Sequence, residues 1–147
     1  MDTIESAWVL GHRIRRWETD RSYGLIEVVS PPKVPGPPPH RHEREREFFL
    51  ILNGELDVMT DGAWQTLRAG SFVELAPNTV HTFINNGSQD VAWVTGWRPK
   101  GFEKFFRDFG IPVDEARAQE RSVSADMIQR VIASCEGYGS LKTRMPV

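Results

Sequence analysis

Residues 36–54, GPPPHRHEREREFFLILNG, contain two closely spaced histidines and a long apolar run. The two histidines, His40 and His42, follow a run of prolines at a spacing of two. Residues two apart point in nearly opposite directions on an α-helix, whereas on a β-strand they lie on the same face. The prolines favour extended backbone for the residues around them. The pair therefore predicts a strand that presents both imidazoles to one side.

Two further polar residues are expected near the same place. Glu47 begins an apolar run that ends at the turn signal Asn53-Gly54, and His81 stands at the head of a later strand. Three imidazoles and one carboxylate suit Fe(II), Mn(II), Ni(II), Co(II) or Zn(II), with open positions for water or substrate. Read singly, each histidine is as well explained by a surface loop or by a satisfied strand position, so the combination carries the interpretation.

The chain on both sides of this stretch has the pattern of an all-β protein. Short runs rich in Val, Ile, Phe, Trp and Thr alternate with turn signals such as Asp61-Gly62 and Asn86-Gly87, as in sandwiches and barrels. The expected strands cover residues 8–17, 23–30, 46–52, 55–60, 63–68, 71–76, 80–85 and 90–98. The proline-rich residues 31–39 are interpreted as a stiff loop at the rim.

After Pro99 the pattern becomes helical. Phenylalanines at spacings of three and four predict a helix over 102–109, and further helices are expected over 114–120 and 125–135. The phenylalanine stripe is interpreted as a face packed on the barrel rather than as a substrate box. We expect one domain, with a β-barrel over 1–99, whose metal site comes from 40–47 and 81, and a docked helical extension over 100–147. The tail past Gly137 is expected to be loose.

Composition excludes several classes of protein. The 147 residues carry 18 Lys and Arg against 20 Asp and Glu, a formal net charge of −2, which argues against nucleic acid as a partner. Cys135 is the single cysteine, so a disulfide framework is excluded. Asp2 and Glu5 near the start do not fit a signal peptide. With no long apolar run, no membrane contact is expected, and we expect a cytoplasmic protein.

The spacing of these residues resembles the two motifs of the cupin superfamily. The first motif corresponds to Gly36, His40-x-His42-x4-Glu47-x6-Gly54, and the second to Gly70-x5-Ala76-x-Asn78-x2-His81-x3-Asn85. The sequence departs from the family pattern where Gly36 lies closer to His40, where Ala76 replaces a proline and where Asn78 replaces a glycine. The segment 95–112 also resembles the one that follows the barrel in single-domain bacterial cupins of the quercetin-dioxygenase-like type.

The resemblance implies a double-stranded β-helix, or jelly-roll, barrel. It also implies that His40, His42, Glu47 and His81 bind one divalent metal ion inside the barrel. Strand alternation from Glu47 and His81 directs Phe49, Ile51, Phe83 and Asn85 toward the same interior, so these four are the expected substrate pocket. Such a lining suits a small, largely apolar organic molecule that reaches the metal through a hydroxyl, carbonyl or carboxylate group.

The expected function is that of a metal-dependent dioxygenase or oxygenase acting on an enolic, phenolic or carbonyl compound. Glu47 is the candidate catalytic residue, as a metal ligand or, after detaching, as a base. Two alternatives stay open, namely a non-redox lyase or isomerase and a small-molecule-binding protein without catalysis. Sheet edges that pair between subunits, together with the resemblance, lead us to expect a homodimer. The identities of the metal and of the substrate are left open.

Overall fold

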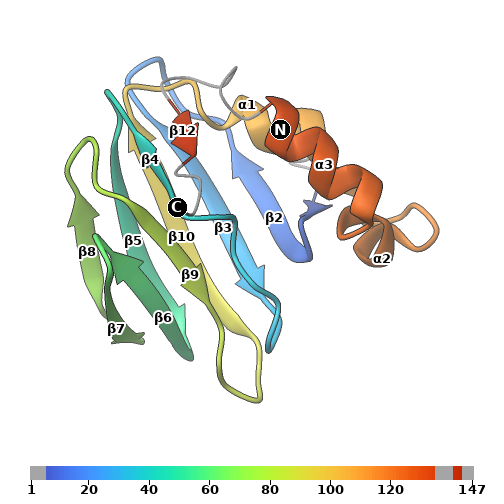
Figure 1. Cartoon of the computed structure of the whole chain (residues 1–147), viewed down its shortest axis with the longest axis horizontal. Coiled ribbons are helices and arrows are strands. Elements are labelled where there is room, and N and C mark those ends of the chain that lie inside the picture. Colours follow the sequence, from blue (N-terminus) through green and yellow to red (C-terminus); the bar gives the residue numbers. More distant parts are fainter. Residues whose placement is uncertain (1–5, 135–140, 144–147) are drawn as a thin grey trace.

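Two antiparallel sheets face each other and enclose a barrel, as Figure 1 shows for the computed structural model of the chain. The structure describes residues 6–134 and 141–143. One sheet has the order β11-β1-β2-β3-β10-β5-β8, and the other has the order β12-β4-β9-β6-β7. The strands of the first sheet are β1 (Ser6–Val9), β2 (His12–Trp17), β3 (Gly24–Ser30), β5 (Arg46–Asn53), β8 (Phe72–Leu75), β10 (Val91–Arg98) and β11 (Ile111–Pro112). Those of the second sheet are β4 (His40–His42), β6 (Glu55–Thr60), β7 (Ala63–Arg68), β9 (His81–Ile84) and β12 (Leu141–Thr143).

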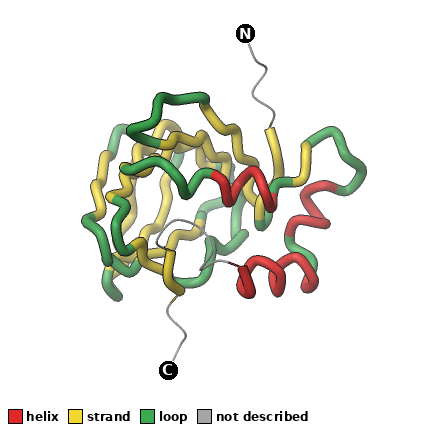
Figure 2. The backbone as a smooth tube through the Cα atoms, turned by 90° about the horizontal axis from the view of Figure 1, so that it is seen from above, coloured by secondary structure: helices red, strands yellow, loops and turns green. Residues whose placement is uncertain are grey.

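Alternation along the strands fills the barrel with side chains. In β3 every second residue is buried, and in β10 Trp93, Thr95 and Trp97 all point inward. Seen from above in Figure 2, the strands surround this interior and the helices lie to one side of it. The predicted double-stranded β-helix architecture with a short helical segment is thus confirmed.

Most predicted strands are confirmed to within one or two residues, but the strand expected over 8–17 is wrong. The chain reverses at Leu10 and Gly11, whose φ angles are 49° and 85°, so β1 and β2 form a hairpin. Leucine rarely adopts a left-handed conformation, and for that reason the sequence did not signal this turn. Asp61 and Gly62 do take the positive φ angles of a two-residue hairpin turn, as expected.

The turn expected at Asn86-Gly87 is built in another way. Neither residue has a positive φ angle. Instead, the side chain of Asn85 accepts a hydrogen bond from the Gly87 amide (2.9 Å) and donates to the carbonyl oxygens of Gln89 (2.7 Å) and Ser30 (2.8 Å). The reversal therefore depends on a buried amide side chain rather than on glycine geometry.

The helical segment is shorter than expected. It consists of α1 (Lys104–Phe109), α2 (Ala118–Ser122) and α3 (Ala125–Ser134), and Cys135 lies outside the described residues. Ser124 caps α3, as its hydroxyl oxygen accepts a hydrogen bond from the Met127 amide (3.2 Å). Val131 is buried on α3, whereas Ile128 is 40% exposed, so the buried face of this helix is narrower than its sequence indicated.

The segment after residue 99 contributes a strand to each sheet. β11 pairs with β1, and β12 pairs with β4. The expectation of a loose tail past Gly137 is therefore wrong for Leu141–Thr143, and the other residues of that tail lie outside the described part of the chain. Within the described residues, no helix is long and apolar enough to span a membrane. The division of the chain at residue 99 stays a prediction.

Candidate metal centre

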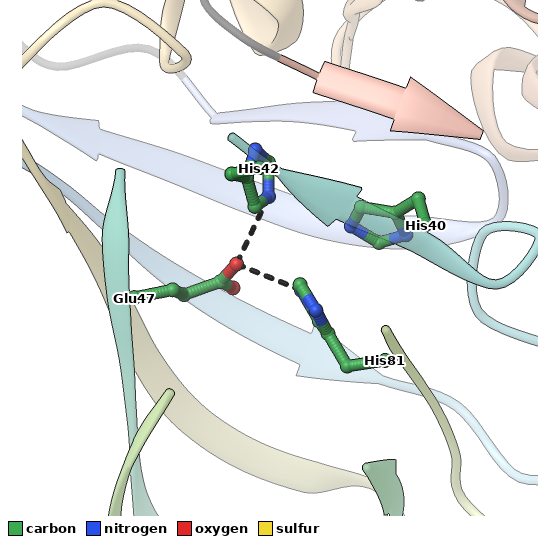
Figure 3. A group of neighbouring side chains, drawn as sticks. All are labelled: His40, His42, Glu47 and His81. Carbon is green, nitrogen blue, oxygen red and sulfur yellow. Dashed lines mark hydrogen bonds and ion pairs between the residues drawn. The ribbon is translucent and has the colours of Figure 1, made fainter. Parts of the chain in front are cut away.

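His40, His42, Glu47 and His81 come together inside the barrel (Figure 3). β4 supplies the two histidines at a spacing of two, and both are buried while the intervening Arg41 is exposed. β9 runs antiparallel to β4 with His81 directly opposite His40. Glu47 comes from β5 in the other sheet. The four residues that the sequence predicted as a ligand set are thus gathered from three strands and both sheets.

The distances between these side chains are short. Glu47 Oε1 lies 2.9 Å from His81 Nε2 and 3.2 Å from His42 Nε2. The ring centroids of His40 and His81 are 4.3 Å apart. One ligand atom from each of the four residues can be chosen such that all lie within 4.8 Å of one another.

Backbone carbonyl groups orient two of the imidazoles. Nδ1 of His40 donates a hydrogen bond to the carbonyl oxygen of Pro38 (3.0 Å), and Nδ1 of His81 donates to that of Thr79 (2.8 Å). A carbonyl oxygen only accepts, so Nδ1 carries a proton in both rings and Nε2 is the atom turned to the cluster. Nε2 of His81 also donates to the Glu47 carboxylate (2.9 Å), and a metal ion bound at this nitrogen would replace its proton. Such bonds to carbonyl oxygens fix the orientation and the tautomer of metal-binding histidines.

His42 is held differently. Neither of its ring nitrogens forms a hydrogen bond of regular geometry within the described part of the chain, although both are buried. Its ring packs edge-on against Phe102, with the centroids 4.6 Å apart. Burying an imidazole nitrogen without a hydrogen bond costs folding free energy unless another partner replaces the lost bond. A metal ion bound to Nε2 would be such a partner.

The donor set fits a divalent metal ion. Bonds of about 2.1 Å would place ligand atoms at most about 4.2 Å apart, so the cluster needs to contract by only a few tenths of an ångström. Three neutral nitrogens and one carboxylate oxygen are ligands accepted by Zn, Fe, Ni, Co and Mn alike. The site thus has the chemistry of a metallo-cupin, and the donor set does not select one metal.

Burial and neighbouring charges shift the pKa values of three residues of the cluster. Burial acts to raise the pKa of Glu47, but the imidazoles of His81 and His42 outweigh it and hold that pKa well below its usual range. Burial acts to lower the pKa of His81, yet the Glu47 carboxylate raises it overall. Burial and the neighbouring histidines lower the pKa of His40 to about 3. Glu47 is therefore charged and His40 neutral, which are the forms that bind metal.

A cavity of about 90 Å³ opens beside the cluster. Glu47, His40 and His81 form part of its wall, and almost all the rest of the wall is apolar. The barrel strands, the proline-rich loop and the helical segment all contribute side chains: Val9, Leu10, His12, Ile14, Ile26, Val28, Pro37, Pro38, Phe49, Phe83, Trp93, Thr95, Trp97, Phe102, Phe105, Phe106, Val131 and Ile132.

The four expected pocket residues divide into two pairs. Phe49 and Phe83 line the cavity. Ile51 is buried in the core outside that lining, and Asn85 is fully buried in the turn that its amide organises. Strand alternation placed all four on the inner face, but alternation does not tell how far along the barrel the open space extends.

Three kinds of cavity residue were not anticipated. Phe102, Phe105 and Phe106 pack on the barrel and also line the cavity, so one side chain can do both. Thr95 donates a hydrogen bond from Oγ1 to Glu47 Oε2 (2.9 Å). His12 donates from Nε2 to the carbonyl oxygen of Pro35 (2.9 Å) and accepts from Ser30 at Nδ1 (3.0 Å). The sequence indicated an inward position for Thr95 only through the alternation Trp93-x-Thr95-x-Trp97.

Comparison with known proteins supports the cupin superfamily. Residues 26–97 match the Cupin domain family. A stretch of 75 residues is 36% identical to quercetin 2,3-dioxygenase of Bacillus subtilis, covering 51% of this chain and 22% of that protein. Another of 45 residues is 40% identical to the HTH-type transcriptional regulator SutR of Escherichia coli, covering 31% of this chain and 25% of the regulator. The chain thus spans about a quarter of the length of either relative.

Solved structures share the fold. A sugar phosphate isomerase of the cupin superfamily from Silicibacter pomeroyi superimposes with a TM-score of 0.60 at 16% identity, covering 67% of this chain and 73% of the isomerase. At this level of identity the likeness concerns the fold alone.

Proposed function

We propose that this chain, a cupin by its fold and by its matched domain, is a metal-dependent dioxygenase or oxygenase of small, largely apolar enolic, phenolic or carbonyl compounds. One observation carries the proposal: three of the four candidate ligands form a polar spot in the wall of a largely apolar cavity, where His12 and Thr95 already have hydrogen-bond partners. A substrate that fills this cavity has one place at which an oxygen atom meets polar groups. Binding and chemistry would therefore coincide at the cluster.

The cavity wall gives the class of substrate. Aromatic and aliphatic side chains favour a ring or a short hydrocarbon. Among the described residues that form the wall outside the ligand cluster, none is a Lys, Arg or Asp. A substrate with a second charged group would leave that charge buried and unpaired, at a cost of several kcal/mol. We therefore expect substrates that carry no charged group besides the hydroxyl or carbonyl that meets the cluster.

Glu47 is the candidate acid–base residue. A bound divalent ion would lower the pKa of a coordinated substrate hydroxyl and, if redox-active, would allow dioxygen chemistry. Oε1 of Glu47 faces the imidazoles of the cluster, so it is the atom that would hold the ion or accept the proton of a substrate hydroxyl. His40 and His81 are held through Nδ1 and stay in place while Glu47 acts.

The similarity to quercetin 2,3-dioxygenase supports the redox version of the proposal. The test begins with protein purified without added metal and without a nickel resin, whose metal content is measured. The protein is then loaded with Fe(II), Mn(II), Ni(II) or Co(II), and oxygen uptake is followed with catechols, β-diketones and flavonols. We expect uptake that depends on metal and that Glu47→Gln abolishes. Absence of uptake with every metal and compound class would overturn the oxygenase proposal.

A non-redox lyase or isomerase is the second candidate. It is favoured by a donor set that accepts Zn(II) as readily as Fe(II). The two candidates differ in their need for dioxygen. A lyase or isomerase loaded with Zn(II) turns over under nitrogen, whereas an oxygenase stops.

A binding protein without catalysis is the third candidate, supported by the similarity to a transcriptional regulator. Such a protein would bind the same apolar compounds at the cavity and return them unchanged after prolonged incubation, with metal and with oxygen.

A further inference from the structure

The two oxygens of the Glu47 carboxylate have different partners. Oε1 faces the imidazoles of His81 and His42 at 2.9 Å and 3.2 Å. Oε2 accepts the hydrogen bond from Thr95 Oγ1 at 2.9 Å. Both residues are buried, with Glu47 5% and Thr95 2% exposed. The carboxylate is therefore held at both oxygens, Oε1 by the imidazoles of the cluster and Oε2 by Thr95.

Thr95 is well placed to hold this orientation. It lies in the middle of β10, between β3 and β5, and pairs with Phe49 while Glu47 pairs with Trp97. Thr95 is thus the diagonal neighbour of Glu47 on the adjacent strand and shares its inward face. A β-branched side chain in the centre of a sheet has little rotational freedom. Its hydroxyl has one proton, and that proton is given to Oε2.

We propose that Thr95 is a positioning residue that reserves Oε1 of Glu47 for the metal ion and keeps Oε2 away from it. The proposal rests on the proposed function, because it assumes that the cluster binds a metal. A carboxylate that binds through one oxygen occupies one coordination position, and one that binds through both occupies two. With three imidazoles already present, the difference decides how many positions remain for substrate and dioxygen.

Two variants of Thr95 separate the effect of its hydroxyl group from the effect of its packing in the barrel. Thr95→Val keeps the shape of the side chain and removes the hydrogen bond, whereas Thr95→Ser keeps the hydroxyl and removes the methyl group. If the hydroxyl positions Glu47, the valine variant is defective and the serine variant is not. If Thr95 only fills the barrel, the serine variant is the more affected of the two.

The probe is Co(II), titrated into the full chain and followed by its visible d–d absorption. We expect Thr95→Val to weaken Co(II) binding about 10–100-fold, the usual effect of losing a group that orients a ligand. We also expect weaker d–d bands in this variant, because a second carboxylate oxygen would raise the coordination number. Thr95→Ser is expected to keep wild-type affinity and bands.

Ser30→Ala is the matched control. Ser30 is a fully buried hydroxyl of the same barrel that bonds to His12 and Trp93 and not to the cluster. This variant is expected to lose stability but to keep the Co(II) spectrum. The role of Thr95 is overturned if Thr95→Val binds Co(II) with wild-type affinity and spectrum, or if both variants lose affinity alike. A wild-type chain that binds no Co(II) overturns the proposed function as well, and absence of oxygen uptake leaves this test unaffected.

Discussion

His81 Nε2 lies 2.9 Å from Glu47 Oε1, although 34 positions separate the two residues in the chain. β9, which holds His81, belongs to the five-stranded sheet, and β5, which holds Glu47, belongs to the seven-stranded one. The pair therefore joins the two sheets of the barrel through buried polar groups. A metal ion in this place would link the sheets through four bonds, so the same residues affect both chemistry and stability.

Replacing His81 by alanine is expected to empty the metal site. The variant removes one of four ligands and also the partner that holds Oε1 of Glu47 in place. We expect metal content after purification to fall below a tenth of the wild-type value, as measured by elemental analysis. His12→Gln is the control, because His12 is equally buried and bonds to Ser30 and Pro35 instead of to the cluster. Full occupancy in His81→Ala would disprove the ligand assignment.

Removing the metal with a chelator is expected to destabilise the chain. An ion held at a free concentration of one hundred times its Kd stabilises the folded state by about 2.7 kcal/mol, and urea unfolding with and without chelator measures this difference. His81→Ala should show no such difference, because it has lost the site. Equal effects of the chelator on wild type and His81→Ala would mean that the stabilising ion binds elsewhere.

The sequence predicted the centre of this site better than its surroundings. The i, i+2 spacing of His40 and His42 requires extended chain, and β4 provides it. What surrounds the ligands depends on contacts between distant segments, which no local pattern encodes. The bond from Thr95 to Glu47 joins residues 48 positions apart, and the packing of Phe102 on His42 joins the helical segment to a strand.

The errors in the fold have local causes. A strand was expected over 8–17 because the left-handed conformation of Leu10 is rare for a branched apolar residue. The short strand Leu141–Thr143 was missed because three residues carry no periodicity, and its pairing with β4 becomes possible only once the barrel has formed.

A homodimer remains a prediction, and the exposed apolar residues suggest where to test it. β8 stands at the end of the seven-stranded sheet, and its Phe72 is 57% exposed and stacks on Phe48 of β5. We expect light scattering coupled to gel filtration to give twice the chain mass for the wild type. Phe72→Lys should shift the protein toward the monomer, because a lysine at a sheet edge opposes pairing.

Trp64→Lys serves as the control for this experiment. Trp64 is 56% exposed but lies on β7, at the end of the other sheet. The dimer should persist in this variant. A monomeric wild type would contradict the prediction altogether, and a monomer in Trp64→Lys alone would move the interface to β7.

His12 is expected to make stability depend on pH. Burial lowers the pKa of His12, and the hydrogen bond to the Pro35 carbonyl only partly opposes this effect. Between the lowered pKa and the ordinary value of about 6.5, the unfolded chain thus binds more protons than the folded one. His12 therefore contributes stability that is fully present above pH 6.5 and is lost as the pH falls below it, by at most about 1.4 kcal/mol per pH unit.

The measurement is the free energy of unfolding in urea at several pH values between 5 and 8, for the wild type and for His12→Gln. His40, whose pKa is also lowered, contributes in the same direction but is present in both proteins, so the difference between the two curves belongs to His12. The wild-type curve should fall more steeply below pH 6.5 than that of His12→Gln. Parallel curves would mean that His12 carries the same charge in the folded and unfolded chains. They would contradict the assignment of His12 as a neutral imidazole that bonds to both Ser30 and Pro35.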